Sequence, residues 1–211
     1  MSKSHILPHP CFIHPVPVDR DVCKLSLGLE GYRVIGTFGF ISRHKGIDMA
    51  IRSLLSLNDD VVLNIGGTPR TRDDELYLSE LRSLVYRLRL EGRVLFSGFI
   101  SESDIPVFMG ATDLALYPYH KNVASGALQY PLAYGVPVLA SDVGVFRDIG
   151  VNEKCIANFQ NNDQNDLNNK IISLFDNPYE LKELGYRGRL YSEKIRVENL
   201  CARLEKIYAE E

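Results

Sequence analysis

A basic stretch in the first part of the chain has the side chains needed to bind an anion. The stretch GFISRHKG, residues 39–46, carries Arg43 and Lys45 on either side of a histidine and ends in Gly46. Lysine and arginine neutralise phosphate or carboxylate groups, and a glycine lets the backbone approach a ligand closely. A basic triplet is more commonly a solvated surface turn, so its place in the fold decides between the two interpretations.

A second stretch, YHKNVASGA at residues 119–127, precedes an apolar run that predicts a helix. The first N–H groups of a helix have no partner within it, and they bind phosphate with help from the helix dipole. Ser125 and Gly126 leave room for an anion there, and His120 stands nearby. The alternative is that Ser125 only caps the helix. Pro131 indicates that the helix either bends or begins its true first turn later.

Both stretches lie between apolar segments of two kinds. Short runs rich in valine, leucine and isoleucine predict strands over residues 34–40, 61–67, 94–99, 114–118 and 136–141. Two helices are predicted from apolar residues at helical spacing, namely Ile47, Ala50, Ile51, Leu54 and Leu55 in one, and Leu76, Leu81, Leu84, Val85 and Leu88 in the other. Strands that are apolar on both faces are typical of a parallel sheet covered by helices. The sequence therefore predicts an α/β fold with a doubly wound parallel sheet and helices on both faces.

Ligands bind a doubly wound sheet beyond the carboxyl ends of its strands. That rule selects four loops, residues 39–46, 66–72, 98–104 and 118–126. Both stretches that suit an anion fall within them, which favours an anion site over a solvated turn. The loop GGTPRTR, which begins at Gly66, lacks the pattern of a phosphate-wrapping loop and indicates only a tight turn.

The composition argues against several classes of protein. The net charge is −3, with acids and bases interspersed, so binding to nucleic acid is not expected. No apolar run approaches the roughly 20 residues of a membrane helix, and the first residues lack the apolar core of a secretion signal. The four cysteines are widely separated, which indicates reduced thiols in a cytoplasmic protein. His5, His9 and His14 lie among prolines that favour extended chain, so no metal site is expected.

The chain divides into three parts. Residues 1–30 are rich in proline and are predicted to form a linker or arm, with one or two helical turns near its end. Residues 31–190 form the α/β domain. Residues 191–211 are predicted to form a carboxyl-terminal helix, whose apolar residues from Val197 to Tyr208 share one face. That face is expected to pack back on the sheet or to mediate self-association.

An ordered set of segments resembles a known family. FGFISRHKGID, VVLNIGG, RVLFSGFIS, ATDLALYP and SGALQYPLAYGVPVLAS resemble, in this order and spacing, the carboxyl-terminal donor-binding domain of group 1 (family four) retaining glycosyltransferases. The resemblance implies one half of a GT-B fold, in which two Rossmann-like domains face a cleft. It also implies transfer of a hexose from a nucleotide diphospho-sugar to a saccharide or lipid-linked acceptor, with no cofactor and no metal.

The resemblance assigns donor-binding roles to residues of three loops. Lys45 is expected to contact the diphosphate. Many relatives have an arginine at the position of Phe40, and Arg43 is expected to compensate for its absence. Further donor contacts are expected at Phe99 and Ile100 for the nucleobase, and at Ser125, Gly126 and Ala127 for the phosphates. His120, from the same loop, is expected beside them from the sequence itself.

Two positions depart from the family pattern. Many relatives carry two glutamates separated by seven residues, and their places here fall on Asn122 and Tyr130. Asn122 can still bond sugar hydroxyls and Tyr130 can reach the ribose, but neither supplies a carboxylate, so no catalytic residue is assigned. The departure keeps open a nucleotide-sugar binding module without catalysis. An epimerase or a phosphorylase on the same fold is a weaker alternative.

The family enzymes have two Rossmann-like domains, whereas this sequence shows the pattern of one. An amino-terminal domain outside this sequence is expected to bind the acceptor. The chain alone is therefore expected to bind the donor without transferring the sugar. The full-length enzyme is expected in the cytoplasm or at the membrane surface.

Overall fold

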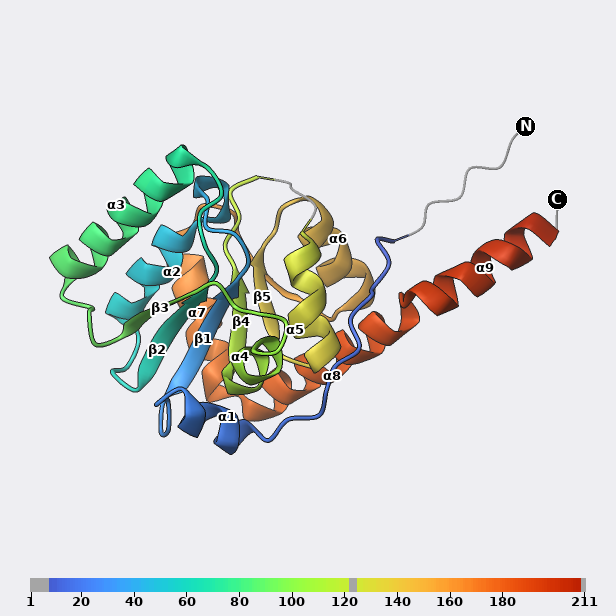
Figure 1. Cartoon of the computed structure of the whole chain (residues 1–211), viewed down its shortest axis with the longest axis horizontal. Helices are drawn as coiled ribbons and strands as arrows, with labels where there is room; N and C mark the ends of the chain where they lie inside the picture. The colour runs from blue at the N-terminus through green and yellow to red at the C-terminus, as the bar shows by residue number, and fades with distance from the viewer. Residues whose placement is uncertain (1–7, 122–124, 210–211) are drawn as a thin grey trace.

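The computed structural model describes residues 8–121 and 125–209, and it contains a six-stranded sheet with helices on both faces (Figure 1). All strand pairs are parallel and the strand order is β3-β2-β1-β4-β5-β6. The strands are β1 (Arg33–Phe38), β2 (Val61–Gly66), β3 (Val94–Gly98), β4 (Leu114–Tyr117), β5 (Val138–Ser141) and β6 (Ala157–Phe159). The order reverses between β1 and β4, where a doubly wound sheet binds its ligand. The predicted fold class is confirmed.

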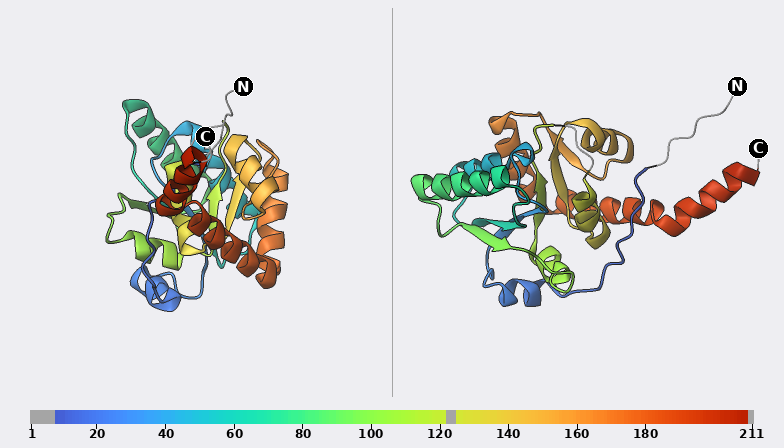
Figure 2. Two further views of the ribbon diagram at one scale, coloured as in Figure 1. Left: turned by 90° about the vertical axis from the view of Figure 1, so that its right-hand side faces the viewer. Right: turned by 45° about the horizontal axis from the view of Figure 1, so that its top comes forward.

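Alternate residues of the strands point to opposite faces of the sheet, and each face has its own core. Ile35 and Leu63 pack with α2 (Ile47–Ser53), α3 (Arg72–Leu88) and α7 (Gln164–Asp176). Tyr117 and Val138 pack with α4 (Ile105–Ala111), α5 (Gln129–Tyr134) and α6 (Gly144–Glu153) on the other face. The two helical layers are visible on either side of the sheet in Figure 2. Burial on both faces explains why the strands are apolar throughout.

The predicted elements agree with the structure, with three corrections. Leu55 was placed on the buried side of its helix but is 58% exposed, because the chain tightens into a 3-10 turn at Leu54–Ser56 and rotates Leu55 outward. Leu76 is 56% exposed, because the buried stripe of α3 begins one residue later at Tyr77. Strand β6 was not predicted, since its three residues are too few to show a period.

The amino-terminal arm packs against the domain. α1 (Arg20–Ser26) lies at the amino-terminal edge of the sheet, where Arg20 and Lys24 pair with the buried carboxylate of Asp113. Earlier in the arm, Cys11 lies beside the junction of α8 (Pro178–Lys194) and α9 (Val197–Ala209). Its N–H donates to the carbonyl of Ile195, and its carbonyl accepts the N–H of Val197. Residues 1–30 were interpreted as a linker or arm, and the described part of that segment is held by these contacts.

The last helix, α9, extends away from the body in Figure 1 and in the right-hand view of Figure 2. Leu200, near its start, is buried in the core that also contains Tyr117 and Val138. The remaining turns project outward, so the predicted packing of this helix on the domain holds only at its beginning. No helix in the described part of the chain has the length and apolar character needed to cross a membrane.

The loops that follow β1 and β4, at the carboxyl edge of the sheet, are in close contact at Gly46. This residue has a left-handed φ of 61°, and a Cβ atom there would lie 2.0 Å from the carbonyl oxygen of Pro118. The same two loops are also joined by a hydrogen bond of 2.8 Å from the N–H of His120 to the carbonyl oxygen of His44. Gly46 therefore allows close approach of another segment of this chain, whereas the sequence suggested approach of a ligand.

We expect Gly46→Ala to lower the free energy of unfolding by at least about 2 kcal/mol, because the substitution combines backbone strain with a clash against backbone. Gly92→Ala is the control, since a Cβ at Gly92 meets no atom within 4 Å. Urea denaturation of both variants measures the difference. Equal stability of the two variants would show that the two loops separate easily.

Candidate functional site

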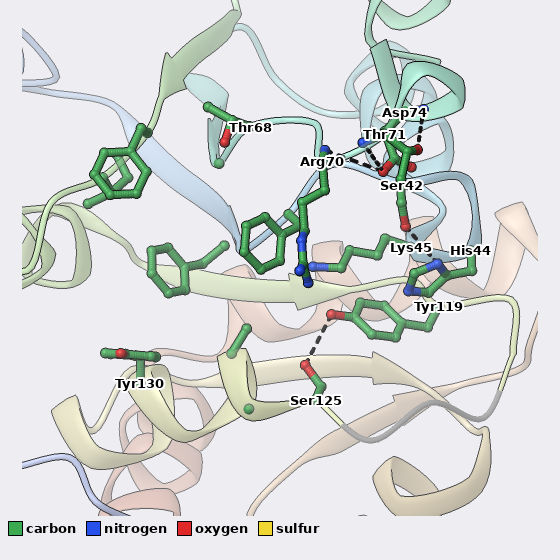
Figure 3. A pocket seen from close by; sticks show the side chains of 18 residues that line it. Ser42, His44, Lys45, Thr68, Arg70, Thr71, Asp74, Tyr119, Ser125 and Tyr130 are labelled. Carbon is green, nitrogen blue, oxygen red and sulfur yellow. Dashed lines mark hydrogen bonds between the residues drawn. The ribbon is translucent and has the colours of Figure 1, made fainter. Parts of the chain in front are cut away.

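A cleft of about 760 Å³ lies at the carboxyl ends of β1, β2, β3 and β4. All four loops selected from the sequence contribute to it. Its wall is aromatic in large part, and it also contains a lysine, an arginine and one carboxylate (Figure 3). The lining residues are Phe38, Gly39, Phe40, Ser42, His44, Lys45, Gly67, Thr68, Arg70, Thr71, Asp74, Phe99, Ile100, Tyr119, Ser125, Gly126, Ala127 and Tyr130.

Lys45 is the main cation of the cleft. It ends the 3-10 turn Arg43–Lys45, and its Nζ lies 5.7 Å from the centre of the Tyr119 ring. Burial lowers the pKa of Lys45 from its usual 10.5 to about 8, and the charge of Asp74 only partly opposes this effect. No residue of the described chain forms a salt bridge with the Lys45 ammonium group. A desolvated cation without a counter-ion is suited to bind an anion.

The Ser125 turn is held by two tyrosines from the end of β4. The hydroxyl of Tyr117 donates to the carbonyl of Ala127 at 3.0 Å, and the hydroxyls of Tyr119 and Ser125 are 3.1 Å apart. The Ser125 side chain makes no capping hydrogen bond, so its alternative role as a cap is not observed. A 3-10 turn, Gly126–Leu128, precedes α5, which confirms that the true first turn of the helix begins later.

Burial also sets the protonation of the groups near Lys45. It raises the pKa of Tyr119 to about 12, so this hydroxyl stays neutral. It lowers the pKa of His44, with a further contribution from the charge of Lys45. The His44 ring lies edge-on to Tyr119 and its Nδ1 is 2.6 Å from the hydroxyl oxygen of Ser42. His44 is thus oriented by Ser42 and disposed to remain neutral beside the lysine.

Two of the predicted donor-binding side chains lie outside this cleft. The guanidinium of Arg43 pairs with Glu80 on α3 and stacks 5.1 Å from the centre of the Tyr77 ring. The Nδ1 of His120 is 2.6 Å from the amide oxygen of Asn162. Arg43 points away from the cleft because it pairs with Glu80, which lies far from it in the sequence. The residues next to Arg43 in the sequence give no sign of this pairing. Asn122 falls outside the described residues.

The remaining predicted residues do come together. Lys45 and the turn Ser125–Ala127 line the cleft, and Phe99, Ile100 and Tyr130 form part of its wall. Phe99 is 75% exposed, an unusual state for a phenylalanine beside a cavity. The Tyr130 ring meets Phe38 edge-on at 5.0 Å. These seven residues are thus assembled in one place, whatever ligand they bind.

The sequence analysis missed the contribution of the loop after β2. This loop was interpreted as a tight turn only, yet Thr68, Arg70 and Thr71 line the cleft. The side chain of Arg70 stacks on Phe40, with its Cζ 4.5 Å from the ring centre. The arginine in GGTPRTR was the available signal, because it lies in a loop at the functional edge of the sheet.

The chemistry of the cleft suits a ligand with an anionic part and a flat ring. Lys45 and backbone N–H groups of the Ser125 turn can neutralise the anion, while Phe99 and Tyr130 can contact a ring. Within residues 8–121 and 125–209 there is no cluster of three or more His, Cys, Asp or Glu side chains that could hold a metal ion.

Comparison with known proteins identifies relatives of the chain. Residues 24–191 match the family described as "Glycosyl transferases group 1". The chain is 33% identical over 135 residues to 2-deoxystreptamine glucosyltransferase from Streptomyces kanamyceticus, covering 62% of this chain and 33% of that protein. It is 31% identical over 137 residues to the lipopolysaccharide core biosynthesis mannosyltransferase LpsB from Rhizobium meliloti, covering 63% of this chain and 38% of that protein.

Solved structures show the same fold. HepE from Anabaena, crystallised in complex with UDP, aligns with a TM-score of 0.82 at 21% identity, over 93% of this chain and 54% of that one. The carboxyl-terminal domain of the group 1 family protein LpcC from Francisella tularensis aligns with a TM-score of 0.75 at 22% identity, over 87% of this chain and 96% of that domain. The chain thus spans about a third of the two sequence relatives and about half of HepE.

The desolvated state of Lys45 has a consequence for stability. The pKa of Lys45 is lower in the folded chain than its usual 10.5. Below pH 8 the lysine is charged in both states, and desolvation of that charge then lowers the free energy of unfolding by its full amount. We expect Lys45→Met to raise the free energy of unfolding at pH 7 by roughly 1–2 kcal/mol. The gain should shrink between pH 8 and pH 10.5, as the wild-type lysine loses its proton.

Denaturation of the two proteins at pH 7 and pH 10 measures this effect, and Lys121→Met, at an exposed position, is the control. A loss of stability in Lys45→Met at pH 7 would show that the ammonium group has a partner.

Proposed function

The chain belongs to the group 1 glycosyl transferase family, and we propose that it forms the part of such an enzyme that binds the nucleotide diphospho-sugar donor. The observation that carries this proposal is the partly buried ammonium group of Lys45, which has no salt-bridge partner in the described part of the chain and lies in an aromatic cleft at the switch point of the sheet. A nucleotide sugar offers the matching groups: a diphosphate for the cation and a base for the aromatic wall. HepE, which has the same fold, binds UDP.

In the proposed complex, the diphosphate lies between Lys45 and the backbone N–H groups of Ser125–Ala127. The nucleobase extends toward Phe99 and Ile100, and Tyr130 faces the ribose. Support for this pose comes from the cleft, which contains all of these residues and is large enough for a small ligand. The hydrogen bonds from Tyr117 and Tyr119 hold the Ser125 turn in place before any ligand arrives.

The proposed reaction moves a hexose to a saccharide or lipid-linked acceptor with retention of configuration at the anomeric carbon. The bond between the anomeric carbon and the β-phosphate oxygen breaks, and negative charge builds up on the departing diphosphate. The acceptor hydroxyl oxygen forms the new bond to the anomeric carbon on the same face and releases its proton. Lys45 and the Ser125–Ala127 amides stabilise that charge. The names of two relatives, a glucosyltransferase and a mannosyltransferase, support a hexose as the transferred group.

One observation favours a binding module without catalysis as the second candidate. Among the described residues that line the cleft, Asp74 is the sole carboxylate. Its oxygen accepts the N–H of Thr71 at 3.2 Å, so it belongs to the capping box of α3. Tyr130 stands where many relatives have a glutamate. A module of this kind retains donor binding and lacks the chemical step.

The first test is the pH dependence of nucleoside diphosphate binding. Between pH 7 and pH 9, His44 and Tyr119 remain neutral, because burial lowers the pKa of the one and raises that of the other, and Lys45 loses its proton near pH 8. We expect affinity for the tightest binder among UDP, GDP and ADP to fall about tenfold over this range. Calorimetry at low salt measures it.

Lys45→Arg is the matched control, because a guanidinium stays protonated throughout this range. Its affinity should therefore vary little with pH, and Lys45→Ala should bind more weakly at every pH. Wild-type affinity that stays constant from pH 7 to pH 9 would contradict the contact between Lys45 and the diphosphate.

We also expect the 211-residue chain alone to bind the donor and yet fail to transfer its sugar to an acceptor. The acceptor must be held close to the anomeric carbon, and the described residues form one Rossmann-like domain with no opposing wall. The measurement is nucleotide release from a panel of nucleotide sugars, with and without acceptor saccharides. Release that depends on the acceptor would overturn this part of the proposal.

A further inference from the structure

Arg70 is a second cation of the cleft, and it has no counter-ion among the described residues. The Cζ atom of Arg70 lies 4.5 Å from the centre of the Phe40 ring. Stacking on an aromatic ring uses the face of a guanidinium and leaves its N–H groups, which lie at the edge, able to donate. Arg70 is thus positioned by Phe40 while its hydrogen-bonding capacity remains available.

Backbone hydrogen bonds hold the loop that carries Lys45 against the loop that carries Arg70. The N–H of Gly39 donates to Gly66 at 2.9 Å, and the N–H of Ile41 donates to Thr68 at 3.0 Å, which joins the loops after β1 and β2. A Cβ atom on Gly39 would lie 2.9 Å from the Nζ of Lys45. Phe40 is the next residue, and Arg70 stacks on its ring. Figure 3 shows the two cationic side chains directed into the same part of the cleft.

Arg43, the other basic residue of this region, is not available for this role. Its guanidinium is paired with Glu80 and stacked on Tyr77. Among the described residues, the lining of the cleft therefore carries two cations, Lys45 and Arg70, against the single carboxylate of Asp74. A diphosphate carries at least two negative charges, more than one ammonium group neutralises.

We propose that Arg70 is the second residue that binds the diphosphate of the donor, with Phe40 as the platform that positions it. This inference rests on the proposed function. Phe40 supplies the ring and the loop after β2 supplies the guanidinium that stacks on it. The planar guanidinium can bond the two free oxygens of one phosphate, so Arg70 favours ligands with a diphosphate over the corresponding nucleoside.

The experiment compares Arg70→Gln with Arg72→Gln. Arg72 begins α3, is exposed and does not line the cleft, so both variants lose one charge from nearly the same place. Calorimetry is performed with UDP, GDP and ADP, and with the nucleoside of the tightest binder. We expect Arg70→Gln to weaken diphosphate binding about 10- to 100-fold and to leave nucleoside binding unchanged. Arg72→Gln should stay within about twofold of the wild type.

Phe40→Leu tests the platform separately. It retains both cations but removes the ring on which Arg70 stacks, so it should weaken diphosphate binding by less than Arg70→Gln does. Thermal melting of all three variants confirms that they are folded, which is expected because Arg70 is exposed and Phe40 is 49% exposed.

The outcomes distinguish the two proposals. Failure of the wild type to bind any of the three diphosphates would overturn the proposed function and this inference with it. Wild-type binding with equal affinities for Arg70→Gln and Arg72→Gln would overturn the role of Arg70 alone. Equal losses of diphosphate and nucleoside affinity in Arg70→Gln would also overturn it, since they would place Arg70 at the nucleoside.

Discussion

The cleft depends on one electrostatic constraint, which is an ammonium group held partly out of water with no counter-ion among the described residues. Lys45 has a pKa of about 8 because burial disfavours its charge. A flexible loop would relieve that cost by turning the lysine into solvent. Here the loop is held on several sides, by the close contact of Gly46 with Pro118 and by the backbone bonds of Gly39 and Ile41 with the neighbouring loop. The fold therefore maintains a charge that only a ligand can neutralise fully.

The parallel sheet supplies the rigidity that this constraint requires. The strands adjoining the cleft, β1 and β4, lie at the point where the strand order reverses, so their loops diverge and leave space between them. Tyr117 and Tyr119 continue β4 into that space and hold the Ser125 turn by their hydroxyl groups. Both tyrosines are buried, so the turn is supported by the core. The anion-binding groups on the two sides of the cleft are thus positioned before a ligand enters.

Much of this arrangement follows from the sequence, and the exceptions have physical causes. Apolar strands, alternating helices and the rule for carboxyl ends were sufficient to predict the fold and the four loops of the cleft. The same reasoning selected Lys45 because its loop lies at that edge. It failed for Arg43, whose direction is set by Glu80, 37 residues later in the chain. It overlooked Arg70, because only the pairing of two loops brings that arginine onto Phe40. Contacts between segments distant in sequence leave no local pattern.

In the proposed complex the cleft binds the diphosphate of a nucleotide between Lys45 and the Ser125 turn. The most direct measurement is a crystal structure of the chain with its tightest-binding nucleoside diphosphate. We expect a phosphate oxygen at about 3 Å from the Nζ of Lys45 and a second within reach of the Ser125–Ala127 backbone. A nucleotide bound elsewhere on the chain, or a diphosphate directed away from Lys45, would contradict it.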